Sequence, residues 1–410
     1  MGVFTNEEKV QILKDVVGFK TVNDNELKVC HYFKALFQKH GIAARIDMVE
    51  GQRANLIAEI GEGSPVLGIS GHMDVVAEGN HSEWTYDPFT LTEADGYLYG
   101  RGAGDMKSGL VALAIAMIEI HESGALKHGR IKFMATTGEE MEQLGSKQLY
   151  ENGEMDDVDA LVIAEPSEKM LVYAHKGSMD FRITSKGRAA HSSMPVIGQN
   201  AIKPLMQFVQ HIDDEFDKIS KALNCERLNF ETFLDYIKPM LSENMDMDDV
   251  SRVLYGLVIT NTIFNGGTQV NSVPGRATAE FNVRTVPEYD NEQVKALFNH
   301  YIELMNQQGA NLEQDVYLDL DPVITTGDNA LVRLGVETAK QHFEHDIIVS
   351  PTVGVTDASN LLRGKDEHFS FMMFGPGERA HQVDERVKKA SYLNFIDYYI
   401  ALFTTYLSKY

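Results

Sequence analysis

The sequence predicts an α/β protein in which a larger domain, built on a mainly parallel sheet, is interrupted by a smaller, ferredoxin-like α+β domain. Three observations predict this architecture. Short apolar runs alternate with longer amphipathic stretches in the first part of the chain, which is typical of a parallel sheet covered by helices. The middle of the chain shows the order β-α-β-β-α-β of a ferredoxin-like fold. From Asp321 the first pattern resumes and runs to Tyr410.

The elements of the larger domain follow from local signals. The first helix is predicted to begin at Thr5, because Glu8 follows three residues later as in a capping box and an apolar helical face comes next. Four apolar runs are predicted as strands: residues 54–60, 66–70, 131–136 and 160–164. Two longer stretches are predicted as helices: residues 108–121 and 145–151. We place this domain at residues 1–178 and 321–410.

The smaller domain is predicted at residues 179–320. Residues 179–185 alternate apolar and polar side chains, as a half-exposed strand does. The later elements are expected in this order: a helix at 201–217, strands at 258–264 and 277–285, a helix at 291–308, and a strand at 312–320. The polar, Met-rich stretch 219–254 is predicted to form extra helices.

Composition and charge exclude several classes of protein. Hydrophobic residues make up 43% of the 410 positions and charged residues 24%, which excludes a disordered or fibrous chain. The formal charge of −23 argues against nucleic acid or an anionic membrane as partner. The two cysteines match no zinc-finger or disulfide framework, and the longest apolar stretch is half of what a membrane span needs. We therefore expect a cytoplasmic protein.

The first candidate for chemistry is the segment SGHMDVV, which follows the strand predicted at 66–70. His72 and Asp74 are two residues apart, so on an extended chain they point to the same side. A carboxylate beside an imidazole fixes its tautomer, which is how a metal-binding His is usually oriented. Taken alone, an ordinary hydrogen-bonded pair at a strand end is the preferred interpretation.

The second candidate is the glycine-rich loop YGRGAGDMKSG. It fails the phosphate-loop pattern because Met106, and not Gly, precedes Lys107, and it fails the dinucleotide pattern because its third Gly is missing. The glycines permit a tight turn that could present Asp105 to a neighbouring site. A purely structural turn is equally open.

Four further candidates are weak alone. The adjacent Glu139 and Glu140 cannot easily point the same way, so one could bind a metal while the other contacts a substrate or water. Taken alone, such a pair of acids is usually a solvated surface feature. Glu165 ends a buried strand at a proline, His381 lies in a Gly/Pro loop, and His191 lies in a turn near the start of the inserted domain.

Together these residues predict a metal site. Four of them follow the carboxyl ends of predicted parallel strands, where open α/β sheets bind ligands, and the loops with Asp105 and His381 could converge on the same edge. Two His and three carboxylates, with no thiolate, match zinc, with cobalt or manganese as substitutes. Five side chains overfill one ion, so two metal ions sharing a carboxylate are predicted.

In these motifs the sequence resembles a family of dizinc amidohydrolases and metallopeptidases. The family includes acetylornithine deacetylase, succinyl-diaminopimelate desuccinylase, aminoacylase and glutamate carboxypeptidase. The resemblance implies two Zn²⁺ per subunit, one bound by His72 and Glu165, the other by Glu140 and His381, with Asp105 as the bridge.

The resemblance also implies catalytic roles and a dimer. Asp74 would orient His72, and Glu139 would be the general base. The inserted domain would be a lid that carries a homodimer interface, and its His191 would reach the partner's active site.

Four residues are expected to bind substrate through the same resemblance: Lys176, Asn271, Arg284 and Thr356. Asn271 and Arg284 are expected beside the substrate carboxylate, where Arg forms a bidentate pair. Glu at position 165 accompanies deacylases and carboxypeptidases in this family, which favours an N-acyl amino acid.

The resemblance therefore implies a metal-dependent amidohydrolase that cleaves the amide of a small N-acyl amino acid. N-succinyl-LL-2,6-diaminopimelate is the leading substrate. The alternatives are an acetylornithine deacetylase, which His175-Lys176-Gly177 resembles more closely, or a carboxypeptidase or dipeptidase. From other classes, a catalytically silent binding protein on the same fold and a nucleotide-binding enzyme remain open.

Overall fold

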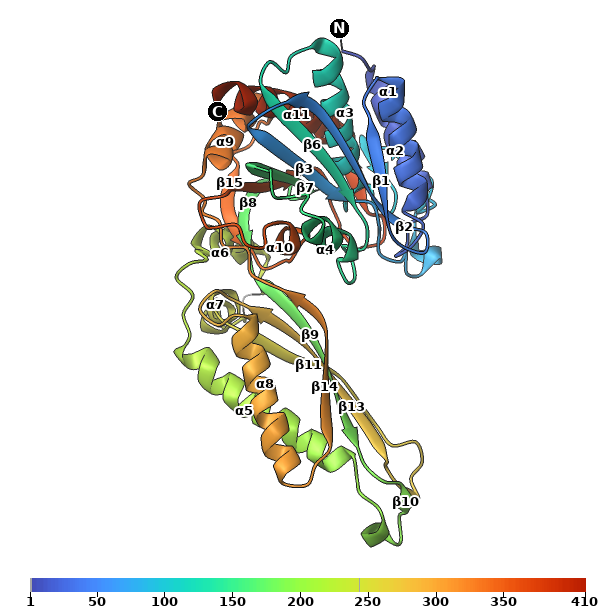
Figure 1. Cartoon of the computed structure of the whole chain (residues 1–410), viewed down its shortest axis with the longest axis vertical. Coiled ribbons are helices and arrows are strands. Elements are labelled where there is room, and N and C mark those ends of the chain that lie inside the picture. Colours follow the sequence, from blue (N-terminus) through green and yellow to red (C-terminus); the bar gives the residue numbers. More distant parts are fainter. Residues whose placement is uncertain (1, 243) are drawn as a thin grey trace. The chain divides into compact units, whose positions relative to one another are not determined.

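The four apolar runs predicted as strands lie side by side in one eight-stranded sheet of the computed structural model (Figure 1). The structure describes residues 2–242 and 244–410. The strand order is β1-β2-β6-β3-β7-β16-β8-β15, and the four central strands β6, β3, β7 and β16 are parallel to one another. The sheet is therefore parallel at its centre, with antiparallel neighbours such as β1 and β2 at its edge. Its strands are β1 (Ala44–Glu50), β2 (Arg53–Glu62), β3 (Val66–His72), β6 (Gly129–Thr136), β7 (Ala160–Pro166), β8 (Met170–His175), β15 (Ile348–Thr352) and β16 (Ser370–Gly375).

Helices cover this sheet and bury its apolar strands. Helix α3 contacts β3, β6 and β7 and packs against α11, while α2 contacts β1 and β2. The predicted capping box at Thr5 and Glu8 is present at the start of α1. The helices are α1 (Asn6–Gly18), α2 (Leu27–Lys39), α3 (Lys107–Ser123), α4 (Leu144–Glu151), α9 (Ala330–His342), α10 (Ala358–Leu361) and α11 (Lys389–Lys409). A small antiparallel sheet adds β4 (Thr92–Ala94), β5 (Tyr97–Tyr99) and β17 (Arg386–Lys388).

Contacts divide the chain into two units. Unit 1 comprises Met1–Tyr173, Thr325–Ser350 and Thr356–Tyr410, and unit 2 comprises Ala174–Ile324 and Pro351–Val355. The order β-α-β-β-α-β expected for the inserted segment appears within unit 2 as β9-α5-β11-β13-α8-β14, and its sheet has the antiparallel order β11-β13-β9-β14.

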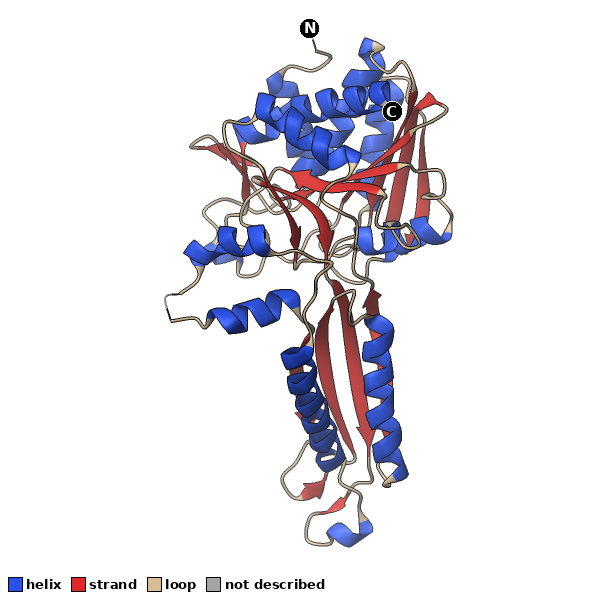
Figure 2. Cartoon of the chain, turned by 90° about the vertical axis from the view of Figure 1, so that its left-hand side faces the viewer, coloured by secondary structure: helices blue, strands red, loops and turns tan. Residues whose placement is uncertain are grey.

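Unit 2 has its own core, in which α5 and α8 pack beside the four-stranded sheet (Figure 2). The rings of Phe181 and Phe298 stack at 4.3 Å in this core. Its strands are β9 (Gly177–Lys186), β10 (Ala190–His191), β11 (Val258–Gly266), β12 (Ser272–Val273), β13 (Arg276–Thr285) and β14 (Leu312–Leu320). Its α-helices are α5 (Ile202–Ala222), α6 (Glu231–Ile237), α7 (Met247–Tyr255) and α8 (Asn291–Gln307), so helices α6 and α7 lie in the stretch predicted to be helical.

None of the helices in the described part of the chain is both long enough and apolar enough to cross a membrane.

Candidate metal centre

The candidate residues of unit 1 gather where the four parallel central strands end. His72 is the last residue of β3, Glu165 lies at the end of β7, and Glu139 and Glu140 follow β6 in a turn that begins with Gly138. His381 lies in the loop after β16. Because β6, β3, β7 and β16 are parallel neighbours, their carboxyl ends meet at one edge of the sheet, which explains why residues far apart in sequence are close here.

Asp105 lies between the two imidazoles. Its Oδ1 is 3.1 Å from Nε2 of His72, and its Oδ2 is 3.4 Å from Nε2 of His381. Each carboxylate oxygen therefore faces a different imidazole. Glu165 Oε1 lies 3.8 Å from the His72 nitrogen, and Glu140 Oε2 lies 2.9 Å from the His381 nitrogen. The five side chains thus form two groups that share Asp105.

Asp74 supports this centre in a way that the sequence did not predict. His72 Nδ1 lies 2.9 Å from the main-chain carbonyl oxygen of Asp74, whereas the nearest carboxylate oxygen is 3.7 Å away. The carboxylate instead accepts hydrogen bonds from the N–H groups of Gly138, Glu139 and Glu140, at 2.8 to 3.2 Å. The main chain of Asp74 therefore orients the imidazole, and its side chain holds the turn that carries both glutamates.

Glu139 lies beside the cluster without joining the pairs around Asp105. Its Oε2 is 4.0 Å from Nε2 of His72, and its Oε1 accepts a hydrogen bond from the Gln143 amide at 3.3 Å. Its side chain is one-tenth exposed, so one face remains accessible from solvent.

The crowding of carboxylates shifts the pKa values of the site. Burial raises the pKa of Glu139 and of Glu165 well above the usual value, and the neighbouring acids add to this although His72 opposes it. Burial alone would lower the pKa of His72, but Glu165 and Asp105 raise it well above its usual value. Hydrogen bonds to Asp105 and Glu140 raise the pKa of His381 to about 10. Negative charge is therefore in excess at this edge.

The donor set fits divalent metal ions. One ligand atom each from His72, Asp105 and Glu140 lies within 4.8 Å of the others, and Glu165 and His381 extend the set on either side. Imidazole nitrogens and carboxylate oxygens without a thiolate suit zinc, cobalt or manganese. Cations would also neutralise the excess of carboxylates.

In unit 2 the structure brings His191 and Asn271 together. The short strands β10 and β12 pair His191 with Ser272, and the carbonyl oxygen of Asn271 accepts a hydrogen bond from Ser192 at 2.9 Å. His191 is exposed, and its Nδ1 lies 2.7 Å from the Ser193 hydroxyl.

Arg284 lies at the opposite end of the same sheet from this ribbon. It pairs with Ser178 across β13 and β9 and donates to the Ser178 hydroxyl. The ribbon of β10 and β12 adjoins the other end of β13, near Arg276; eight residues of strand at about 3.3 Å each separate the two ends by ~26 Å. Within a single chain, Asn271 and Arg284 therefore cannot contact the same small carboxylate, contrary to the simplest expectation from the sequence.

The side chain of Lys176 is held by structural hydrogen bonds and is not exposed. Its Nζ is buried and donates to the carbonyl oxygens of Val253 and Gly256, both at 2.6 Å, at the carboxyl end of α7. The substrate-binding role expected for Lys176 stays a prediction without support from this geometry.

Thr356 is buried in the turn before α10. The next residue, Asp357, was not selected from the sequence. Its carboxylate accepts a hydrogen bond from Thr136 at 2.6 Å, and burial raises its pKa to about 6. In the sequence, Asp357 is a single acid in the segment VGVTDAS, and this pattern does not indicate that its side chain is buried.

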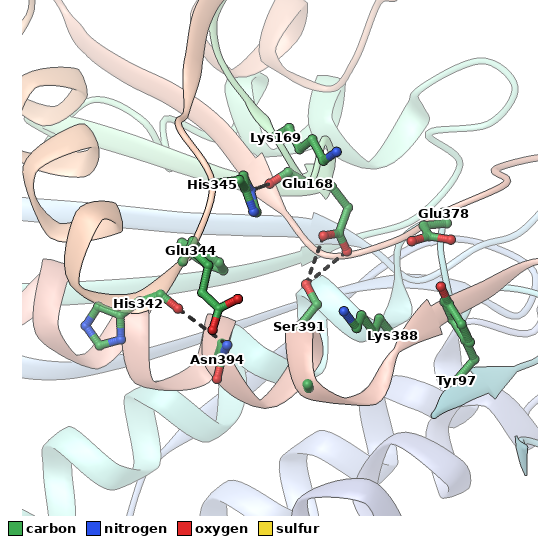
Figure 3. Close-up of a pocket in the computed structure, with 12 residues that line it drawn as sticks. Tyr97, Glu168, Lys169, His342, Glu344, His345, Glu378, Lys388, Ser391 and Asn394 are labelled. Atoms are coloured by element: carbon green, nitrogen blue, oxygen red, sulfur yellow. Dashed lines mark hydrogen bonds between the residues drawn. The ribbon is translucent and has the colours of Figure 1, made fainter. Parts of the chain in front are cut away.

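A separate cavity of about 470 Å³ lies beside the loop after β16 (Figure 3). Glu168 extends along it, and its carboxylate accepts hydrogen bonds from Ser391 at 3.0 Å and from the Gly377 N–H at 3.1 Å. The cavity contains none of the residues predicted for the metal centre, and Glu168 ties the start of the His381 loop to helix α11.

A central parallel sheet with clustered His and carboxylate side chains at its carboxyl edge is typical of α/β enzymes that use a metal ion. Comparison with known proteins gives the family. Residues 68–405 match peptidase family M20/M25/M40, and the chain belongs to this family of amide-bond hydrolases.

Curated relatives match the whole chain. A probable succinyl-diaminopimelate desuccinylase from Staphylococcus epidermidis is 45% identical over 100% of both chains, and one from Staphylococcus aureus is 42% identical with the same coverage. The succinyl-diaminopimelate desuccinylase of Wolbachia pipientis is 26% identical, covering 98% of this chain and 93% of the relative.

Solved structures share the fold. An M20 family metallo-carboxypeptidase from Sulfolobus solfataricus superposes with a TM-score of 0.80 at 20% identity, covering 98% of this chain and 99% of that one. A dinuclear metal-binding M20 peptidase from Bacillus subtilis has a TM-score of 0.65 at 17% identity, covering 99% of each chain. These likenesses confirm the predicted architecture, and the family match confirms the resemblance noted in the sequence.

Proposed function

We propose that this protein hydrolyses the amide bond of an N-acyl amino acid, and that N-succinyl-LL-2,6-diaminopimelate is its substrate. The observation that carries the chemistry is the pair of groups around Asp105, one with each imidazole. The choice of acyl group is supported by the full-length similarity to proteins named as probable succinyl-diaminopimelate desuccinylases.

Two divalent metal ions, with zinc as the first choice, fit this arrangement. His72 and Glu165 would hold one ion, Glu140 and His381 the other, and Asp105 would bridge them. When bound, such ions act as Lewis acids that polarise the amide carbonyl and lower the pKa of water.

Glu139 is the proposed general base. Its carboxylate lies beside the two groups but outside the contacts around Asp105, so an oxygen is available to take a proton from the attacking water. The same carboxylate then delivers this proton to the nitrogen of the leaving amine. The amide of Gln143 orients the Glu139 carboxylate by donating a hydrogen bond to its Oε1 oxygen.

A homodimer is the proposed working form. His191 and Asn271 lie at one end of the sheet of unit 2 and Arg284 at the other, so one chain cannot bring all three to a small substrate. A second copy could supply the first two, with His191 stabilising the oxyanion and Asn271 binding the carboxylate. Beside His191, the apolar side chains of Val196 and Val270 are 82% and 99% exposed, as expected of a surface that another chain covers.

The substrate is tested by measuring amine release from N-succinyl-LL-2,6-diaminopimelate and N-acetylornithine with zinc-reconstituted protein. We expect turnover of the succinyl substrate, and a loss of ~10²–10⁴ in kcat in Glu139→Gln with zinc content unchanged. Preference for the acetyl substrate would support an acetylornithine deacetylase in its place. Turnover of only dipeptides with free amines would contradict a deacylase. If no amine is released from any of these substrates, a binding protein is favoured.

The acetylornithine alternative rests on His175-Lys176-Gly177 in the sequence. In the structure, main-chain carbonyl groups engage the side chains of both His175 and Lys176, so these residues give little reason to expect an acetyl substrate.

The dimer is tested by mixing two inactive variants, Glu139→Gln and His191→Ala. Partial recovery of activity is expected, because a mixed dimer contains one site with both residues intact. If the mixture remains inactive although both variants bind zinc and are dimeric, His191 does not act across the interface.

A further inference from the structure

Glu385 is a buried carboxylate that holds the main chain of the loop carrying Asp105. It is 0% exposed. Its Oε1 accepts three hydrogen bonds from the N–H groups of Gly102, Gly104 and Asp105, at 2.9, 2.9 and 2.8 Å. Its other oxygen pairs with the guanidinium of Arg101, which is itself buried. Four donors from one short loop therefore converge on one side chain.

The N–H groups of Arg101 and Ala103 donate to the carbonyl oxygens of Pro88 and Gly100, whereas those of Gly102, Gly104 and Asp105 donate to Glu385. Residues 100–106 lie between β5 and α3, outside any helix or strand. A loop of this kind needs partners for its N–H groups, and a buried carboxylate that accepts several of them gives strong, charge-assisted hydrogen bonds. The N–H of Asp105 is one of these donors, so Glu385 directly fixes the residue whose two oxygens face His72 and His381.

Glu385 also links this loop to the segment that carries His381. It lies four residues after His381 in the sequence, and its carbonyl oxygen accepts a hydrogen bond from the N–H of Gly100 at 3.0 Å. The two segments approach closely, since a Cβ on Gly377 would lie 2.3 Å from the carbonyl oxygen of Gly104. The distance between Asp105 and His381 therefore depends on this contact region.

We propose that Glu385 is a positioning residue of the metal centre: it sets the place of Asp105 between the two imidazoles without binding metal or substrate itself. This inference rests on the proposed role of Asp105 as a shared metal ligand. The carboxylate is suited to this role because all four converging donors require an acceptor. In Glu385→Gln one oxygen becomes an amide NH₂ group, which cannot accept a hydrogen bond from either the N–H groups or Arg101.

The test measures cobalt binding by the full-length protein, using the visible absorption of Co²⁺, independently of any substrate. We expect Glu385→Gln to bind Co²⁺ ~10–100-fold more weakly and to change the absorption spectrum, as partners of metal ligands do. A reduced kcat with little change in KM is expected in the same variant.

Glu119→Gln is the matched control. Glu119 is a buried acid of unit 1 that accepts hydrogen bonds from the N–H groups of Val3 and Phe4, so its loss removes comparable bonds away from the metal centre. We expect this control to lower Tm without altering the affinity for Co²⁺. If Glu385→Gln behaves like the control, with a lower Tm and unchanged cobalt affinity and spectrum, the positioning role is wrong.

A second variant covers the case in which Glu385→Gln does not fold. Glu385→Asp keeps the negative charge but shortens the side chain by one methylene, so the carboxylate can no longer reach the three N–H groups and Arg101 together, and a several-fold loss of cobalt affinity is expected. Unchanged affinity there would contradict the proposal. Normal cobalt binding by the wild type without turnover of any acyl substrate would count against the proposed substrate alone, whereas normal cobalt binding by Asp105→Asn would remove the metal role on which this inference rests.

Discussion

His175 illustrates how one buried side chain makes stability depend on pH. It is 0% exposed, and its Nδ1 lies 2.7 Å from the carbonyl oxygen of Lys176. Burial lowers the pKa of His175 to about 4, because the charged imidazolium loses its hydration there. The side chain is therefore neutral in the folded protein at neutral pH.

The stability of the protein should fall as the pH drops below about 6.5, the usual pKa of His in an unfolded chain. Between that pH and about 4, the unfolded state binds a proton at His175 that the folded state does not, so protonation favours unfolding. The contribution reaches about 3 kcal/mol, at ~1.4 kcal/mol per pH unit. Urea unfolding at a series of pH values should show a shallower acid slope for His175→Gln than for the wild type. The exposed His128→Gln is the control, and equal slopes in wild type and His175→Gln would contradict this account.

The sequence predicts well those site residues that directly follow strands. His72, Glu139, Glu140 and Glu165 could be selected because parallel strands deliver their carboxyl ends to one edge, and the structure places them there. A side chain that only accepts main-chain N–H groups is not recognisable in the same way, and Asp74 was selected only because it lies two residues from His72. Accepting N–H groups leaves no pattern in a sequence with 60 acids, so Glu385 was missed.

At the scale of elements, apolar runs of normal length were predictable and short or edge segments were not. The run at 66–70 became β3, which is buried along its whole length, because only a fully covered parallel strand tolerates continuous apolar sequence. Strands β4, β5 and β17 have three residues each, too few for any periodicity to be detected. The edge pairing of β8 and β15 depends on contacts distant in sequence, which local patterns do not contain.

The packing of α3 on β7 depends on one glycine. A Cβ added to Gly109, in the first turn of α3, would lie 2.1 Å from the carbonyl oxygen of Ala164 and 2.9 Å from its Cβ. Helix and strand are thus in direct contact at this point, immediately before Glu165 in the sequence.

Gly109→Ala should therefore destabilise the protein, although Ala is normally favoured over Gly in a helix by ~1 kcal/mol. The helix must move away from β7, which costs ~1–3 kcal/mol as overpacking does, and the shift would also displace Glu165. The free energy of unfolding from urea titration measures this. Gly18→Ala, at the end of α1 with nothing within 4 Å of the added methyl, should be neutral or slightly stabilising. Equal effects of the two substitutions would show that α3 and β7 have room to adjust.

At the scale of the whole molecule, the two units have separate reasons to be stable. Unit 2 surrounds its own hydrophobic core, which includes Phe208, Phe281 and Phe298. Unit 1 contains the cluster of carboxylates, where burial raises the pKa of Glu139 and Glu165 and like charges oppose one another. Metal ions should therefore matter for the stability of unit 1 more than for that of unit 2.

Removing the metal ions with a chelator should loosen unit 1 selectively. A ligand that binds only the folded state stabilises it by about 2.7 kcal/mol at a free concentration of 100 times its Kd, and this contribution disappears on chelation. Hydrogen exchange followed by peptide mass analysis should show lost protection in the segments that carry the proposed ligands, residues 68–76, 100–110, 136–143, 162–168 and 375–386. Strands β9, β13 and β14 should keep their protection, because their core lacks these ligands. Added zinc should restore the first group, and in Asp105→Asn the chelator should have a smaller effect. Equal loss of protection in both units would mean that the units unfold as one, and no loss anywhere would contradict a metal centre in unit 1.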